Sequence, residues 1–166
     1  AAYAGLGEGD KALDFQRQYL EKGTNITSTD WANFAGIYIK MGDQVDSLDH
    51  AKAVGYYTQA MDVYEKMTEK FPTLKDWCWV AEASVALGKL KDLDKVRDLY
   101  MKVAEYEEAK ADKSDANTKN YLVAAYYFLG YYYAGKNDAE TSKSYFEKLI
   151  QIDPENAEAK KALGLE

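Results

Sequence analysis

The residues that could carry out acid–base or nucleophilic chemistry are few in this sequence. His50 is its only histidine and Cys78 its only cysteine. A catalytic base or nucleophile needs a partner side chain that orients or activates it, and neither residue has such a partner near it in the sequence. Unless folding brings His50 and Cys78 together, we expect no catalytic residue, and the chain is predicted not to be an enzyme.

A second candidate is Gly130–Asn137, whose sequence GYYYAGKN is one residue short of the GxxxxGK[S/T] loop that binds phosphates. That loop follows a strand, offers free backbone N–H groups and ends in a hydroxyl for Mg²⁺. Here no strand is predicted before the segment, and Asn137 has no hydroxyl. We therefore expect no nucleotide site, and we interpret Gly130 as a contact between helices and Gly135 as part of a turn.

Metal and cofactor sites are not predicted either. Asp43, Asp46 and Asp49 recur at every third residue, but no glycine and no distal glutamate completes a calcium-binding loop. A single cysteine excludes a zinc site built from several cysteines. The glycine cluster Gly5–Gly9 lacks the dinucleotide-binding pattern and is interpreted as a turn between helices.

Charge and length narrow the classes of partner. The chain has 166 residues and a formal net charge of −7, which disfavours nucleic acids and anionic membrane surfaces because both need a basic protein face. No apolar run reaches the roughly 18 residues of a membrane-spanning helix. The first residues do not resemble a signal peptide. Since the sequence also lacks an initiator methionine, we expect it to be part of a longer protein of undetermined compartment.

The elements that must position any binding residue are predicted to be helices. Few segments alternate apolar and polar residues as half-buried strands do. Tyr121–Tyr133 is apolar almost all round, which is typical of a buried helix. Gly135–Asp138 follows as a turn, with Asn and Asp available to cap the next helix. In that helix Tyr145, Leu149 and Ile152 form one apolar face.

The same plan of helix, turn and helix recurs along the chain. Tyr3 and Tyr38 are 35 residues apart, as are Gly7 and Gly42, and recurrence at a fixed offset is typical of helical repeats. Later spacings are longer because of insertions. The predicted helices are Ala12–Lys22 (capped by Gly23), Trp31–Met41, Tyr56–Phe71, Trp77–Leu87 and Lys95–Glu108; turns are expected at Gly7, Gly42-Asp43 and Gly88, and insertions at Gln44–Val54, Lys89–Asp94 and Ala109–Thr118.

These residues resemble the tetratricopeptide repeat. The last copy matches best, with Ser142 where the family usually has Ala. Its matching residues are Tyr126, Leu129, Gly130, Tyr133, Asn137-Asp138, Phe146 and Pro154. The copy from Ser28 matches at Trp31, Phe34, Ala35, Tyr38, Gly42-Asp43, Ala60, Tyr64 and Pro72, and the copy from Leu74 matches at Trp77, Val80, Ala81 and Gly88, although Ser84 replaces the usual Tyr and the closing Pro is missing.

The resemblance implies an all-α fold, a right-handed superhelical stack of antiparallel helix pairs. We expect a single domain over residues 1–166, in which small residues such as Ala35, Ala81 and Gly130 let helices approach, and large rings such as Trp31, Trp77 and Tyr126 fill the space between pairs. The predicted parts are a truncated repeat over 1–26, a repeat with an insertion over 28–72, a repeat over 74–108, a link over 109–120, a repeat over 121–154 and a capping helix over 155–166.

The resemblance further implies a non-catalytic scaffold that binds a peptide or helix of a partner protein in a concave groove. In this family the first helix of each pair lines the groove. That implies three stripes, namely Thr29, Ala32, Gly36 and Ile39; Lys75, Cys78, Glu82 and Val85; and Ala124, Tyr127, Tyr131 and Ala134. Of these we expect contacts to a partner from Ala32, Ile39, Lys75, Cys78, Glu82, Tyr127 and Tyr131.

Tyr127 and Tyr131 are the best anchors because tyrosine is favoured at interface hot spots, although both could instead pack against a neighbouring repeat. The basic clamp with which some members hold a chaperone's C-terminal carboxylate is absent, because its positions carry Ala32, Gly36, Trp79, Ala124 and Phe128. Two other functions stay open. The truncated first repeat could leave an apolar end for self-association, and the chain could be an accessory region of a larger protein.

Overall fold

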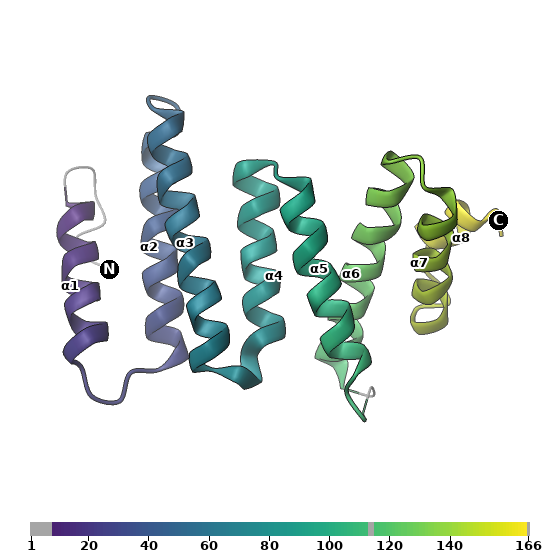
Figure 1. Cartoon of the computed structure of the whole chain (residues 1–166), viewed down its shortest axis with the longest axis horizontal. Coiled ribbons are helices and arrows are strands. Elements are labelled where there is room, and N and C mark those ends of the chain that lie inside the picture. The colour runs from purple at the N-terminus through teal and green to yellow at the C-terminus, as the bar shows by residue number, and fades with distance from the viewer. Residues whose placement is uncertain (1–7, 113–114, 166) are drawn as a thin grey trace. The chain divides into compact units, whose positions relative to one another are not determined.

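The computed structural model describes residues 8–112 and 115–165, and these residues form helices and no strand. The chain divides into two compact units, Ala1–Asp92 and Leu93–Glu166. Successive helices follow one another along both units, which confirms the predicted all-α helical repeat fold (Figure 1). The predicted helix end at Tyr3 and the turn at Gly7 lie outside the described residues.

The described residues of the first unit, 8–92, form four α-helices, and each helix packs against the next one along the chain. The helices are α1 (Gly9–Lys22), α2 (Ser28–Val45), α3 (His50–Lys70) and α4 (Lys75–Val85), with a 3₁₀ turn at Pro72–Leu74 and a π-helical turn at Ala86–Leu90. The second unit contains α5 (Leu93–Glu108), α6 (Ala116–Gly135), α7 (Ala139–Ile152) and α8 (Ala157–Leu163). Because α4 and α5 fall in different units, the repeat over 74–108 stays a prediction.

Side-chain caps fix where the helices begin. A capping box starts α2, in which the Thr27 hydroxyl accepts from the Asp30 N–H and the Asp30 carboxylate accepts from the Thr27 N–H. Such caps satisfy backbone groups that the helix itself leaves unpaired. At the end of α1 the N–H of Gly23 donates to the Tyr19 carbonyl, which confirms the predicted C-cap.

The turn predicted at Gly42-Asp43 is wrong, because α2 continues to Val45 and the chain reverses at residues 46–49. Gly42 has a different role, since a Cβ atom added there would lie 2.4 Å from Cε1 of Tyr57. The Tyr57 hydroxyl donates to Asp43 Oδ1 at 2.8 Å, and Lys89 Nζ donates to the same oxygen at 2.5 Å. The missing side chain of Gly42 therefore allows α3 to pack closely on α2, and the insertion lengthens both helices.

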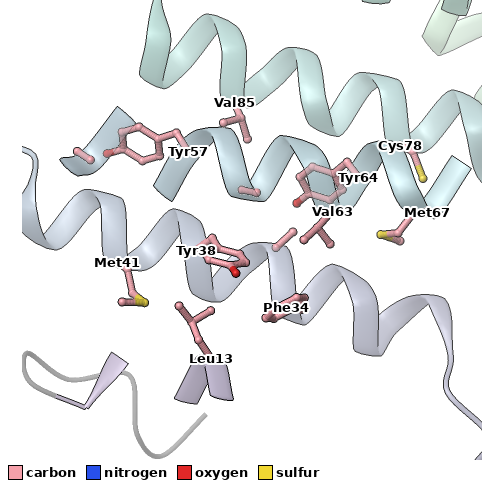
Figure 2. Close-up of a cluster of buried hydrophobic side chains, with 13 residues drawn as sticks. Leu13, Phe34, Tyr38, Met41, Tyr57, Val63, Tyr64, Met67, Cys78 and Val85 are labelled. Atoms are coloured by element: carbon pink, nitrogen blue, oxygen red, sulfur yellow. The ribbon is translucent and has the colours of Figure 1, made fainter. Parts of the chain in front are cut away.

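The core of the first unit is one cluster of apolar side chains from all four of its helices (Figure 2). Leu13 comes from α1, and the larger contributions come from α2 and α3. Tyr57 and Met67 are fully buried. Trp31 is partly buried against this cluster, whereas Trp77 keeps 38% of its surface exposed and packs edge-on to Tyr64. Trp77 therefore does not fill an interior space as predicted.

In the second unit α6 begins at Ala116, where Asp115 accepts from the Thr118 N–H. The link predicted over 109–120 is therefore wrong at its second boundary, and it is shorter than predicted. Asp138 caps α7 as expected, and Gly164, with a φ of 66°, ends α8.

The close contact between α6 and α7 confirms the predicted role of Gly130. A Cβ atom there would lie 2.8 Å from Cζ of Phe146. The buried Ser142 hydroxyl donates to the Gly130 carbonyl at 2.8 Å. This hydrogen bond accounts for serine at the position where the family usually has alanine. None of the helices in the described part of the chain is long and apolar enough to cross a bilayer.

Candidate functional site

The stripe predicted on α4 is not available to a partner. Cys78 is fully buried within the core cluster, and only 3% of Glu82 is exposed. Burial raises the pKa of the Cys78 thiol to about 11. The prediction of Cys78 and Glu82 as binding residues is wrong, because their face of α4 points into the protein. Trp77 and Ser84 lie on the exposed side of this helix. Lys75, at the start of α4, is partly buried.

The stripe predicted on α2 offers no large exposed side chain. Ala32 and Ile39 are partly buried and pack against the core cluster. The exposed face of α2 is polar or small, and it consists of Thr29, Asn33, Gly36, Lys40 and Asp43. A role for Ala32 and Ile39 in binding a partner stays a prediction.

The stripe on α6 is exposed and aromatic. Tyr127 and Tyr131 lie one helical turn apart and keep 41% and 42% of their surface exposed. Their ring centroids are 4.9 Å apart, at an interplanar angle of 58°. The Tyr131 ring also packs against Phe146 of α7, in a T-shaped pair with ring centroids 5.2 Å apart. The two alternatives for these tyrosines thus coexist in Tyr131, which packs on one side and faces solvent on the other.

Glu158 on α8 completes this surface. The Tyr131 hydroxyl donates to Glu158 Oε2 at 2.7 Å. This acceptor, together with desolvation, raises the pKa of Tyr131 to about 12. We name Tyr127, Tyr131 and Glu158 the tyrosine site. Sequence reasoning missed Glu158 because it treated α8 only as a cap, and no spacing signal links it to Tyr131 across 27 residues.

A hollow adjoins the tyrosine site. It measures about 570 Å³ and lies between α6, α7 and α8. Its lining includes Ala134 and Phe146, the latter being the ring that Tyr131 contacts, as well as Leu163. The hollow therefore reaches the ring on which Tyr131 packs, although Tyr127, Tyr131 and Glu158 do not line it.

Tyr126 and Tyr132, the tyrosines of α6 next to the tyrosine site, form hydrogen bonds within the protein. The Tyr126 hydroxyl donates to Glu108 Oε1 at 2.5 Å, and Lys148 Nζ lies 5.4 Å from the centre of its ring. Burial and Glu108 raise the pKa of Tyr126. Tyr132 donates to Asp94. Both residues are nearly buried, so they hold α5, α6 and α7 together rather than a partner.

The first unit has a hollow of its own, about 360 Å³ in volume, between α1 and α3. Trp31, Phe34 and Tyr38 of α2 contribute to its lining. Charges of both signs surround it, namely Arg17, Glu21, Asp62, Lys66 and Lys70. Sequence reasoning missed this hollow because the resemblance directed attention to the groove side of the first helices only.

The described residues do not form the paired histidine and cysteine or the metal-binding cluster that sequence analysis considered. His50 is exposed and its Nδ1 lies 2.6 Å from Asp46 Oδ1, whereas Cys78 is in the core. The two residues are therefore not paired with each other. No group of three or more His, Cys, Asp or Glu side chains in the described part could hold a metal ion.

Comparisons with known proteins agree with the fold. Residues 123–156 match the family model of the tetratricopeptide repeat. The chain is also similar to the crystal structure of the C-terminal part of a TPR repeat-containing protein from Cytophaga hutchinsonii. The TM-score is 0.56 at 16% identity, and the match covers 97% of this chain and 83% of that one. No curated protein matches the sequence.

Proposed function

We propose that this chain, which belongs to the tetratricopeptide repeat family, is a non-catalytic scaffold that binds a peptide or helix of a partner protein at the tyrosine site. Tetratricopeptide repeats generally mediate interactions between proteins. The observation that carries the proposal is the pair of exposed rings at Tyr127 and Tyr131, inside the segment that matches the family.

Physical chemistry supports a binding role for these two rings. Exposing apolar surface to water is unfavourable by about 25 cal/mol per Å², yet both rings keep about two fifths of their surface exposed, including Tyr131, which also packs against Phe146. Tyrosine offers a large rigid contact area with a polar end, and it is enriched among residues that dominate binding energy. The adjoining hollow, about 570 Å³ in volume, provides room for a side chain of the partner.

The proposal can be tested by selecting binders from a displayed library of short random peptides against the wild-type chain. The recovered peptides are then titrated against the double variant Tyr127→Ala, Tyr131→Ala. We expect their affinity to fall at least tenfold. Tyr19→Ala is the matched control, because Tyr19 is a tyrosine of similar exposure, 44%, on α1. Equal affinity for wild type and double variant, with an intact helical spectrum, would show that the tyrosine site is not the binding surface.

A second candidate function is self-association through the first unit. Phe15 and Tyr19 lie one turn apart on α1, and they are 63% and 44% exposed. Sedimentation equilibrium over a range of concentrations tests this candidate. Dimers that dissociate in Phe15→Ala would support it, and a monomer at every concentration would contradict it.

A further inference from the structure

Within this protein, lysine and arginine side chains lie over many aromatic rings. The distances from the cation to the ring centre run from 5.1 Å, for Lys70 over Trp31, to 5.9 Å, for Lys52 over Tyr56. In the second unit such cations cover Tyr106, Tyr126, Tyr132 and Tyr145. A cation over a ring face is attracted by the ring quadrupole, so the protein repeatedly places a basic side chain on its tyrosines, both buried and partly exposed.

The tyrosine site departs from this pattern. Among the described residues, no lysine or arginine lies over Tyr127 or Tyr131, although these are the exposed aromatic side chains of the second unit. Glu158 likewise forms no ion pair with a described residue, and its carboxylate accepts a hydrogen bond from the Tyr131 hydroxyl. Lys160, on the same helix, is paired with Glu155 at 3.0 Å.

We propose that the tyrosine site binds a basic side chain, arginine or lysine, of the partner peptide. The basic group would lie on the rings of Tyr127 and Tyr131, with its charge against the carboxylate of Glu158. This inference rests on the proposed function and adds the chemistry of the partner to it.

The geometry favours a cation over the other classes of side chain. The two exposed rings lie close together, with centroids 4.9 Å apart, and the face of each ring carries negative potential. The hydrogen bond from Tyr131 holds one oxygen of Glu158 at the same place. An acidic side chain would be repelled by Glu158, and an apolar one would cover the carboxylate without a partner for its charge.

Arginine suits the site better than lysine. Its planar guanidinium stacks on an aromatic ring while its N–H groups donate to a carboxylate. The net charge of −7 adds a weak long-range attraction for a basic peptide, which raises the association rate at low ionic strength.

The test uses the whole chain and blocked pentapeptides of the form Ala-Ala-X-Ala-Ala, with X as arginine, lysine, citrulline or glutamate. Citrulline is the matched control because it keeps the shape of arginine and removes its charge. Binding is followed by the NMR signals of the Tyr127 and Tyr131 rings at millimolar peptide, with Tyr19 as the reference ring. We expect saturable shifts with arginine and lysine, weaker or no shifts with citrulline and glutamate, and weakening by added salt.

The variant Glu158→Gln distinguishes the contribution of the carboxylate charge from that of the two rings, because it keeps an acceptor for Tyr131 but removes the negative charge. We expect this variant to bind the arginine peptide about two- to fivefold more weakly, the size of an exposed ion pair, and the citrulline peptide with unchanged affinity. Equal binding of the arginine and citrulline peptides would overturn the inference, as would an unchanged affinity in Glu158→Gln or no shift with any basic peptide.

The outcomes also distinguish this inference from the proposed function. Library peptides that need Tyr127 and Tyr131 but carry no basic residue would refute the inference and leave the binding role standing. If library peptides bind without needing the two tyrosines, the proposed function itself fails.

Discussion

Replacing Gly42 by alanine tests how α2 and α3 pack. The new Cβ atom would lie 2.4 to 2.8 Å from three atoms of the Tyr57 ring. That ring is fully buried, and its hydroxyl is held by Asp43, so it cannot turn away without losing packing and a hydrogen bond. Such overpacking costs about 1–3 kcal/mol, and alanine returns up to about 1 kcal/mol through its higher helix propensity.

We therefore expect Gly42→Ala to lower the free energy of unfolding by about 1–2 kcal/mol. For a unit of this size that corresponds to a fall in melting temperature of about 4–16 °C. Thermal and urea unfolding followed by circular dichroism measure it. Gly36→Ala is the control, because Gly36 is on the same helix with no atom within 4 Å of its added Cβ, and it should be neutral or stabilising.

The double variant Gly42→Ala, Tyr57→Leu identifies the cause. If the contact with the ring is responsible, Gly42→Ala should cost less in the Tyr57→Leu background than in the wild type. A Gly42→Ala variant that is as stable as Gly36→Ala would refute the close approach of the two helices.

Three further predictions follow from burial and charge. Cys78 is fully buried and its pKa is raised to about 11, so we expect its thiol to react with a disulfide reagent only as fast as the first unit opens. Urea at concentrations below the unfolding midpoint should therefore accelerate the reaction. Immediate reaction in native buffer would contradict this expectation. The raised pKa of Tyr131 stabilises the fold at pH values below the unfolded tyrosine pKa of about 10. This contribution should be lost as the pH rises from there toward about 12, so the stability of the wild type relative to Tyr131→Phe should fall across that pH range. Tyr126→Ala should cost about 3–5 kcal/mol, as for a buried ring, whereas Trp77→Ala should cost less because 38% of Trp77 is exposed; equal losses in urea unfolding would argue against this difference.

The sequence was sufficient to predict the all-helical repeat fold and some of the contacts between helices. Gly130 was predicted to be a contact between helices because it matches a small-residue position of the repeat, and the close approach of Phe146 confirms this. Gly42 was assigned to a turn because the resemblance to the tetratricopeptide repeat implies a turn at Gly-Asp. Which of the two roles a glycine has depends on the residue that faces it, here Tyr57, and a local pattern does not show that residue.

The candidate site could be predicted only in part, for a related reason. Helical spacing placed Tyr127 and Tyr131 on one face of a helix, and the structure shows that this face is exposed. The same spacing placed Cys78 and Glu82 on a binding face, which is buried because the orientation of α4 depends on packing with α3. Glu158 reaches Tyr131 only because of where α8 lies, and no periodic pattern in the sequence indicates that position.

The most direct test of the proposed binding role is isothermal titration of one library-selected peptide into the wild-type chain, the Tyr127→Ala, Tyr131→Ala variant and the Tyr19→Ala control. We predict saturable binding to wild type and control, and at least a tenfold loss in the double variant. Equal affinity for all three folded proteins would contradict the conclusion that the exposed face of α6 binds the partner.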